Sequence, residues 1–154
     1  YELVDDLASA AGLDWYEISN WSRGEQHRCR HNLAYWRGGD WWGIGPGAHR
    51  HRDGLRSWNV KHPSRYAQYL AEDRLPVQDS ERLADHDRLT ERIMLELRLR
   101  DGVDIAAVPA ATRPMIERHL ALGHVDEDAL SAGRLVLTRH GRLLADAVTR
   151  DLVP

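Results

Sequence analysis

One short segment of this 154-residue chain brings together side chains that suit a flat aromatic ligand. A histidine, an amide and two aromatic rings stand within six residues, at His31, Asn32, Tyr35 and Trp36. Histidine is a common axial ligand of haem iron, and aromatic side chains present flat faces to a ring system. Cations that could pair with haem propionates are Arg30, Arg37 and Arg50. The segment indicates a haem site with His31 as the candidate iron ligand, and core packing is the alternative for Trp36.

A second pattern overlaps the first and could bind a transition metal. In an extended backbone, His27, Cys29 and His31 point to the same side. Imidazole and thiolate groups are ligands for soft and borderline metals, so Cys29 is a second and weaker candidate metal ligand. The alternative interpretation is a pair of surface histidines beside a buried cysteine.

A glycine-rich turn follows at Gly43–His49, with the sequence Gly-Ile-Gly-Pro-Gly-Ala-His. It is too short for a dinucleotide-binding fingerprint and lacks the lysine of a phosphate-binding loop. Glycines such as Gly45 and Gly47 allow a ligand to approach the backbone closely. The sequence therefore predicts either a ligand-contacting loop that includes Ala48 and His49 or a simple tight turn.

The elements that must position these residues begin with an α/β unit. Apolar residues at helical spacing predict a helix that ends near Gly12, and Leu13–Ser19 is typical of a strand. Glu17, near the end of that strand, is a candidate polar contact, because ligands gather at the carboxyl ends of strands in α/β folds. One helix–strand unit cannot close a parallel sheet, so we expect the C-terminal portion of a longer protein. A small α+β domain is the alternative.

Residues 20–62 show little periodicity, and their many glycines predict irregular structure with short strands near 41–45 and 56–60. A helix is expected from Pro63, followed by a linker at 74–82. The expected organisation is therefore a first segment at 1–62, a helix and linker at 63–82, and a separate domain at 83–154. The fold class is α/β plus α+β.

The order of elements in residues 83–154 resembles a winged helix. The pattern predicts a helix to about Arg100, a short helix from Asp104, a helix over 112–122, a hairpin pairing 124–126 with 135–137, and a last helix capped by Thr138. Winged helices often bind DNA, but an acidic run at 126–128 directly follows the third element and would repel phosphate. A structural or partner-docking module is favoured over a nucleic-acid binder.

Composition limits the partners and the cellular compartment that are expected for this chain. The net charge is −3, which argues against nucleic acid or an anionic membrane as a partner. The single cysteine excludes an internal disulfide and fits the cytoplasm. Neither a signal peptide nor a membrane-spanning run is visible in this sequence.

Several segments in order resemble the HemW-type haem chaperones, radical S-adenosylmethionine proteins similar to oxygen-independent coproporphyrinogen III oxidase. They are Tyr16–Asn20, Arg30–Asp40, Gly43–His49, His62–Pro63 with Tyr66, and Leu137–Leu144. The resemblance covers nearly the whole chain. Its most specific part is the His-Asn-x-x-Tyr-Trp run followed by the Gly-Ile-Gly-Pro-Gly-Ala-His run.

The resemblance implies roles for particular residues. Its haem-binding motif falls on His31, Asn32, Tyr35 and Trp36. The glycine segment, with Gly45, Gly47, Ala48 and His49, is implied to lie near S-adenosylmethionine. Residues 1–19 correspond to the last part of a partial (β/α) barrel. The family usually has serine where this chain has Arg50, so a hydroxyl contact is not expected there.

The resemblance also implies a function that this chain cannot carry out in full. The family holds a [4Fe–4S] cluster with three cysteines in a Cys-x-x-x-Cys-x-x-Cys pattern, whereas this chain has only Cys29. We therefore expect no catalysis by this chain alone, and the cluster to lie in a missing N-terminal barrel portion.

The implied role is to bind haem and pass it to acceptors such as respiratory enzymes, in the cytoplasm or at the inner face of the membrane. Part of a porphyrinogen-oxidising enzyme is the alternative, and a nucleic-acid-binding module is the third. Exposed barrel edges would favour a homodimer.

Overall fold

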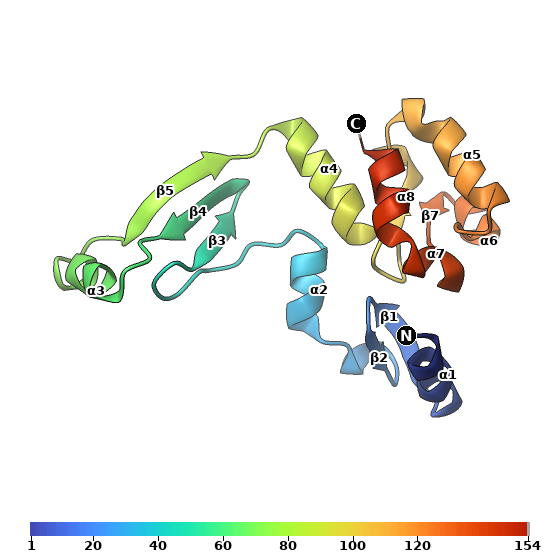
Figure 1. Ribbon diagram of the computed structural model, residues 1–154, viewed down its shortest axis with the longest axis horizontal. Coiled ribbons are helices and arrows are strands. Elements are labelled where there is room, and N and C mark those ends of the chain that lie inside the picture. Colours follow the sequence, from blue (N-terminus) through green and yellow to red (C-terminus); the bar gives the residue numbers. More distant parts are fainter. Residues whose placement is uncertain (154) are drawn as a thin grey trace. The chain divides into compact units, whose positions relative to one another are not determined.

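The computed structural model describes residues 1–153 and divides into two compact units (Figure 1). The first unit, here called the helical unit, contains residues 1–37 and the chain from residue 89 onward. The second, here called the sheet unit, contains residues 38–88. The fold class is mixed, with helices and short antiparallel sheets.

The helical unit begins with a helix and a small hairpin. The elements are α1 (Glu2–Ala10), β1 (Asp14–Glu17), β2 (Asn20–Ser22), the 3₁₀ helix η1 (Glu25–His27) and α2 (Arg30–Trp36). Gly12 follows α1 with a φ of +73°, as expected for a glycine that ends a helix. The predicted strand is present but shorter. Its strand neighbour among residues 1–153 is the antiparallel β2, which was not predicted.

The remainder of the helical unit contains mostly short helices. Its elements are α4 (Asp85–Glu96, of which residues 85–88 fall in the sheet unit), β6 (Val103–Asp104), η2 (Ile105–Ala107), η3 (Ala110–Thr112), α5 (Arg113–Ala121), α6 (Glu127–Ser131), β7 (Arg134–Leu135), α7 (Arg139–Leu143) and α8 (Ala145–Leu152). Val125 pairs with Leu137, so part of the expected contact is present, but α6 lies between the two segments and Leu135 pairs with Val103 instead. Thr138 caps α7 by accepting a hydrogen bond from the amide of Gly141. The predicted last helix is divided at Leu144, and α6, capped by Asp126, was not predicted.

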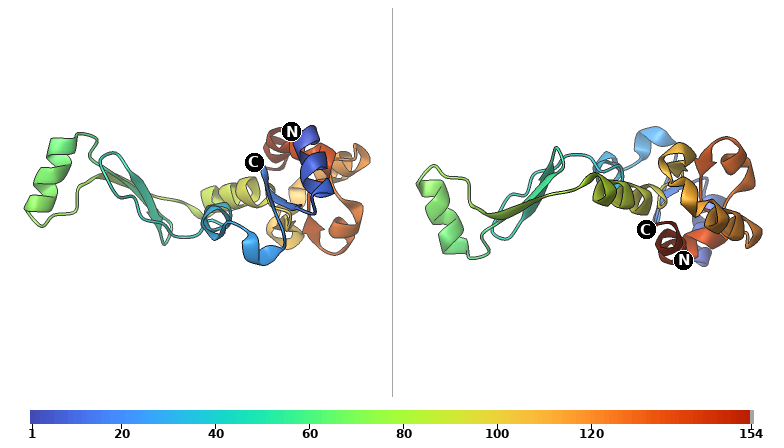
Figure 2. Two further views of the ribbon diagram at one scale, coloured as in Figure 1. Left: turned by 90° about the horizontal axis from the view of Figure 1, so that it is seen from below. Right: turned by 90° about the horizontal axis from the view of Figure 1, so that it is seen from above.

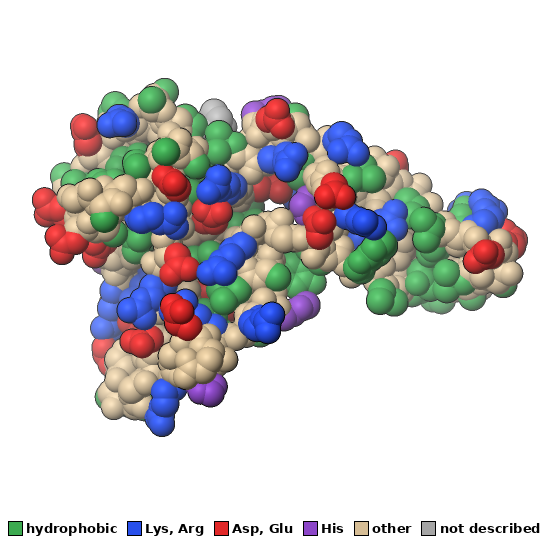
Figure 3. All heavy atoms as spheres, turned by 180° about the vertical axis from the view of Figure 1, so that it is seen from behind, with side chains coloured by type: hydrophobic (Ala, Val, Ile, Leu, Met, Phe, Trp, Pro, Cys, Tyr) green, Lys and Arg blue, Asp and Glu red, His purple; other side chains and the backbone are tan. Residues whose placement is uncertain are grey.

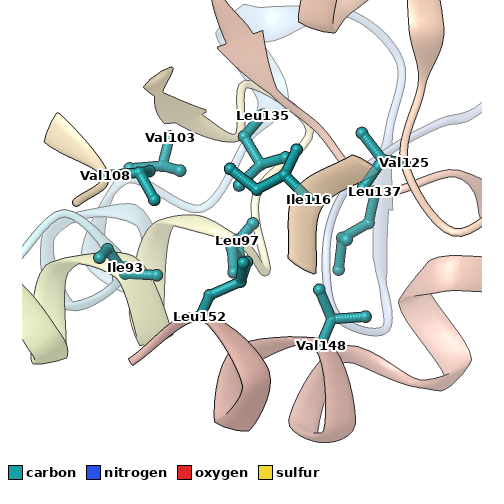
Figure 4. Packing of buried hydrophobic residues seen from close by; sticks show 10 residues of the cluster. All are labelled: Ile93, Leu97, Val103, Val108, Ile116, Val125, Leu135, Leu137, Val148 and Leu152. Atoms are coloured by element: carbon teal, nitrogen blue, oxygen red, sulfur yellow. The ribbon is translucent and has the colours of Figure 1, made fainter. Parts of the chain in front are cut away.

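One hydrophobic core holds this part of the helical unit together. Side chains from α4, α5, α8 and the β6–β7 pair converge on it (Figure 4). Its buried members are Ile93, Leu97, Val103, Val108, Ile116, Val125, Leu135, Leu137, Val148 and Leu152. Ile93 on α4 and Leu97, directly after its last residue, are four residues apart and both fully buried, so the apolar stripe expected from helical periodicity faces this core.

The sheet unit contains an antiparallel sheet in the order β3-β4-β5 and one helix, which lies beyond one end of the strands in Figures 1 and 2. The elements are β3 (His49–Arg52), β4 (Leu55–Asn59), α3 (Pro63–Ala71) and β5 (Val77–Arg82). The helix begins at Pro63 as predicted. The segment at 74–82, expected to be a linker, contains β5, which pairs with β4 from Val77 to Arg82. Five of its six residues are exposed, so hydrophobic alternation could not reveal the strand.

The surface of the sheet unit carries exposed hydrophobic groups. Trp42, Ile44, Leu70 and Leu75 are more than half exposed, and Figure 3 shows hydrophobic side chains gathered on this unit. Across residues 1–153, the helices are all too short or too polar to span a lipid bilayer.

Candidate functional site

The haem-binding motif predicted from sequence lies on a helix, α2. Cys29 is the N-cap residue, and its carbonyl oxygen accepts a hydrogen bond of 3.1 Å from the amide of Leu33. His27 lies in the preceding 3₁₀ turn, η1. The expectation that His27, Cys29 and His31 share one face of an extended segment is therefore wrong, because only an extended backbone has a period of two. In the part of the chain described, residues 1–153, no three His, Cys, Asp or Glu side chains are placed to hold a metal ion together.

His31 and Tyr35 form one edge of α2. They lie four residues apart, and helical geometry places such residues next to each other. Their ring centroids are 4.9 Å apart, with the rings nearly perpendicular at 88°. Both side chains are exposed, as is Cys29. This edge therefore presents an accessible imidazole supported by an aromatic ring.

Asn32 and Trp36 form the neighbouring edge of α2, which faces the β1–β2 turn. Asn32 donates a hydrogen bond of 3.1 Å to Oε1 of Glu17 at the end of β1. Asn20 donates a second hydrogen bond, of 2.6 Å, to the same oxygen. These groups line a cavity of about 340 Å³ together with Tyr35. The motif thus divides between an exposed edge and an edge that lines a polar cavity.

Strand β1 holds α2 in place through two consecutive side chains. Besides the bond from Asn32 to Glu17, the backbone amide of Cys29 donates to the Tyr16 hydroxyl at 3.1 Å. Tyr16 and Glu17 are both buried, at 4% and 2% exposure. The sequence analysis gave Glu17 as a polar contact near a strand end. Its partnership with Asn32, 15 residues later, could not be predicted without the fold.

The glycine-rich segment lies in the sheet unit, so the structure does not unite the two sequence motifs in one compact unit. Its conformation is set by Asn59, whose side-chain amide donates to the carbonyl oxygens of Gly43 and Gly45 at 3.1 and 2.9 Å. Gly45 and Gly47 have positive φ values of +110° and +69°. Glycine adopts such values without steric cost.

Backbone amides of the glycine segment bond within the protein. Gly45 donates to the Tyr66 hydroxyl at 3.1 Å, Gly47 to the Val60 carbonyl at 3.0 Å, and Ala48 to the Gly45 carbonyl at 3.3 Å. These three amides are therefore not directed at a ligand. The exposed side chains of the segment include Ile44 and His49, whose ring centroid lies 5.7 Å from that of Trp58.

A histidine cluster in the helical unit was not predicted from the sequence, because His140 and Asp151 are far along the chain from His119 and His124. Nδ1 of His119 lies 2.9 Å from Nδ1 of His124, and Nε2 of His119 lies 3.2 Å from Asp151. The His140 ring lies 5.2 Å from that of His124. Partial burial lowers the pKa of His124, and the neighbouring His119, His140 and Arg118 lower it further. The neutral form of His124 is thus favoured.

Comparison with known proteins identifies relatives of the whole chain. The family described as "HemN C-terminal domain" matches residues 83–144. A protein named "Heme chaperone HemW" from Mycobacterium tuberculosis (strain CDC 1551 / Oshkosh) is 53% identical over 155 residues, which cover 99% of this chain and 38% of that protein. Proteins of the same name from Escherichia coli (strain K12) and Bacillus subtilis (strain 168) are 32% and 29% identical, each over 96% of this chain and 40% of the relative. The chain therefore spans about two fifths of these relatives.

A solved structure has a similar fold. It is described as "Coproporphyrinogen III oxidase (HemN) from Escherichia coli is a Radical SAM enzyme". The match has a TM-score of 0.70 and covers 99% of this chain and 39% of that one, at 15% sequence identity. The likeness concerns the fold alone.

Proposed function

From the membership of this chain in the HemW-type family of HemN-like proteins, we propose that it is the part of a haem chaperone that holds haem for transfer to an acceptor protein. The haem is cargo, and the site is the exposed edge of α2. The proposal extends to this chain the name that its relatives carry, "Heme chaperone HemW".

The observation that carries this proposal is the exposed His31–Tyr35 pair on a helix with no buried residues. An accessible imidazole can bind haem iron through a ring nitrogen, and the perpendicular Tyr35 ring limits how far His31 can turn. Cys29, exposed at the N-cap, is a second candidate ligand. Asn32 and Trp36 act from the neighbouring edge, Asn32 through its bond to Glu17. An exposed ligand suits a carrier, because the acceptor must be able to reach the iron.

The resemblance implies two further cofactors, a [4Fe–4S] cluster and S-adenosylmethionine, and the residues of this chain suit them to different degrees. Cys29 is the single cysteine, so these residues do not fit a three-cysteine [4Fe–4S] site. S-adenosylmethionine is proposed to lie beside the segment of Gly45, Gly47, Ala48 and His49. The two positive-φ glycines support close approach of a ligand. Because the amides of Gly45, Gly47 and Ala48 bond internally, the segment would contact S-adenosylmethionine through its surface and the His49 side chain. When bound, S-adenosylmethionine would supply radical chemistry that needs a cluster held elsewhere.

We propose a finer organisation on the same basis. Residues 1–62 are the end of a partial barrel, residues 63–82 connect it, and residues 83–154 form a winged-helix-like domain that docks partners. The acceptors are haem-requiring respiratory enzymes, in the cytoplasm and at the inner membrane face. Two chains are proposed to associate as a homodimer through exposed apolar surface such as Trp42 and Ile44.

The proposed haem site is tested by titrating the chain with haem and following the absorption of the bound pigment. Saturable one-to-one binding is expected. His31→Ala is expected to weaken it at least tenfold, which corresponds to about 1.4 kcal/mol. His27→Ala is the matched control, because His27 is an equally exposed histidine four residues earlier. His49→Ala tests the other motif. If the His31 variant binds as tightly as the unchanged chain, the site on α2 is wrong.

A further inference from the structure

The cavity between α2 and the β1–β2 turn contains a carboxylate in an unusual setting. Glu17 is 2% exposed, yet its carboxylate accepts hydrogen bonds from two neutral amides, those of Asn20 and Asn32, both at Oε1. Among residues 1–153, no arginine, lysine or histidine forms an ion pair with it. Burying a charge without a counter-ion is costly, and neutral hydrogen bonds offset only part of that cost. A cationic ligand would supply the missing counter-ion.

The walls of the cavity are suited to a flat group. Tyr35 and Trp36 contribute aromatic surface, and Ile18 and Ser19 come from the turn. Ile18 has a φ of +20°, an unusual value for a β-branched residue. Its amide donates to the Arg98 carbonyl at 3.3 Å, and its carbonyl accepts from Trp15 at 3.0 Å. The surrounding structure therefore holds the turn that shapes the cavity.

We propose that this cavity binds a small organic cation, an ammonium or amidinium group attached to a flat apolar body. The cationic group pairs with the Glu17 carboxylate, and the flat body lies against Tyr35 and Trp36, where a cation–π contribution is also available. The Glu17 carboxylate favours a cation over an anionic group such as a haem propionate in this cavity. The cavity is thus a second ligand site on α2, and this inference does not depend on the proposed haem function.

Benzamidine is the probe, with benzamide as its neutral and benzoate as its anionic counterpart, titrated into the full chain by calorimetry. We expect benzamidine to bind at least tenfold more tightly than either counterpart. Glu17→Gln keeps an oxygen that can accept from Asn20 and Asn32 but removes the charge. It should therefore reduce benzamidine affinity at least tenfold. Glu25→Gln, which neutralises an exposed carboxylate in η1, should leave it unchanged.

A second measurement covers the case in which Glu17→Gln is misfolded. In the unaltered chain, the side-chain amide NMR signals of Asn20 and Asn32 should shift with benzamidine and not with benzamide. Equal binding of benzamidine and benzamide, unchanged affinity in a folded Glu17→Gln chain, or shifts confined to other residues would each overturn the proposal.

Haem titration of Glu17→Gln separates the two sites. Loss of benzamidine binding with intact haem binding supports two sites, whereas failure of haem binding in the unaltered chain affects only the haem proposal.

Discussion

At the scale of residues, the two edges of α2 present different side chains. A helix places residues four apart on the same edge, so His31 pairs with Tyr35 while Asn32 and Trp36 face the neighbouring cavity. The exposed edge offers a metal-binding nitrogen, and the other edge is tied to Glu17. Side chains adjacent in sequence therefore have different surroundings, and under the two binding proposals substitutions along the motif should have separable effects.

Asn59 is the residue on which the glycine-rich segment depends most. It is 6% exposed and donates to the carbonyl oxygens of both Gly43 and Gly45. Asn59→Ala leaves both acceptors without this donor, and we expect it to lower the free energy of unfolding by about 2–3 kcal/mol. Urea denaturation followed by tryptophan fluorescence measures this change. Gln78→Ala, an exposed amide on β5, should change stability by less than about 0.5 kcal/mol. Equal effects of the two substitutions would contradict the assigned role.

At the scale of elements, β1 positions α2, and three helices meet at the histidine cluster. His119 lies on α5, His140 on α7 and Asp151 on α8, with His124 between α5 and α6. At 2.9 Å, the two Nδ1 atoms of His119 and His124 can share only one proton in a hydrogen bond. Protonating both rings places two donors face to face. The packing of these helices therefore depends on at least one ring staying neutral.

The lowered pKa of His124 predicts that stability depends on pH. The folded state binds the proton on His124 more weakly than the unfolded state does, because burial and the charges of His119, His140 and Arg118 disfavour the imidazolium. The contribution of His124 to the free energy of unfolding is therefore fully present above the unfolded-state pKa of about 6.5. It decreases as the pH drops below that value.

Urea midpoints measured between pH 7.5 and 5 test this expectation. The decline should be smaller in His124→Gln than in the unchanged chain. His86→Gln is the control, since His86 is an exposed histidine at the start of α4, beside Asp87. A pH profile that is identical in the His124 variant would rule out this residue as the cause.

At the scale of the whole molecule, the helical unit has a hydrophobic core of ten buried side chains. Leu135 on β7 is fully buried in that core, where Val103 is its strand partner. Leu135→Ala removes buried apolar surface and leaves a cavity, so we expect a loss of about 2–5 kcal/mol in unfolding free energy. Leu122→Ala, at a position 52% exposed, should cost less than about 1 kcal/mol. Thermal unfolding by circular dichroism distinguishes the two, and a loss below about 1 kcal/mol for Leu135→Ala would mean that this core is not tightly packed.

Local patterns in the sequence were enough to predict the elements that depend on neighbouring residues. The stripe at Ile93 and Leu97, the cap at Thr138 and the start of α3 at Pro63 follow from helical periodicity, hydrogen bonding within one turn and the fixed φ of proline. The motif residues His31, Asn32, Tyr35 and Trp36 were also recognised, together with the family that they indicate.

The tertiary structure decided what depends on partners distant in sequence. α2 was not predicted because its seven residues have no buried face and hence no apolar stripe. β5 was not predicted because a mostly exposed strand is specified by backbone pairing with β4. The bond from Asn32 to Glu17 and the contact of His119 with Asp151 join residues 15 and 32 positions apart. Side-chain type shows what such groups could do, but only the folded chain brings them within hydrogen-bonding distance, because that distance depends on how separate elements pack.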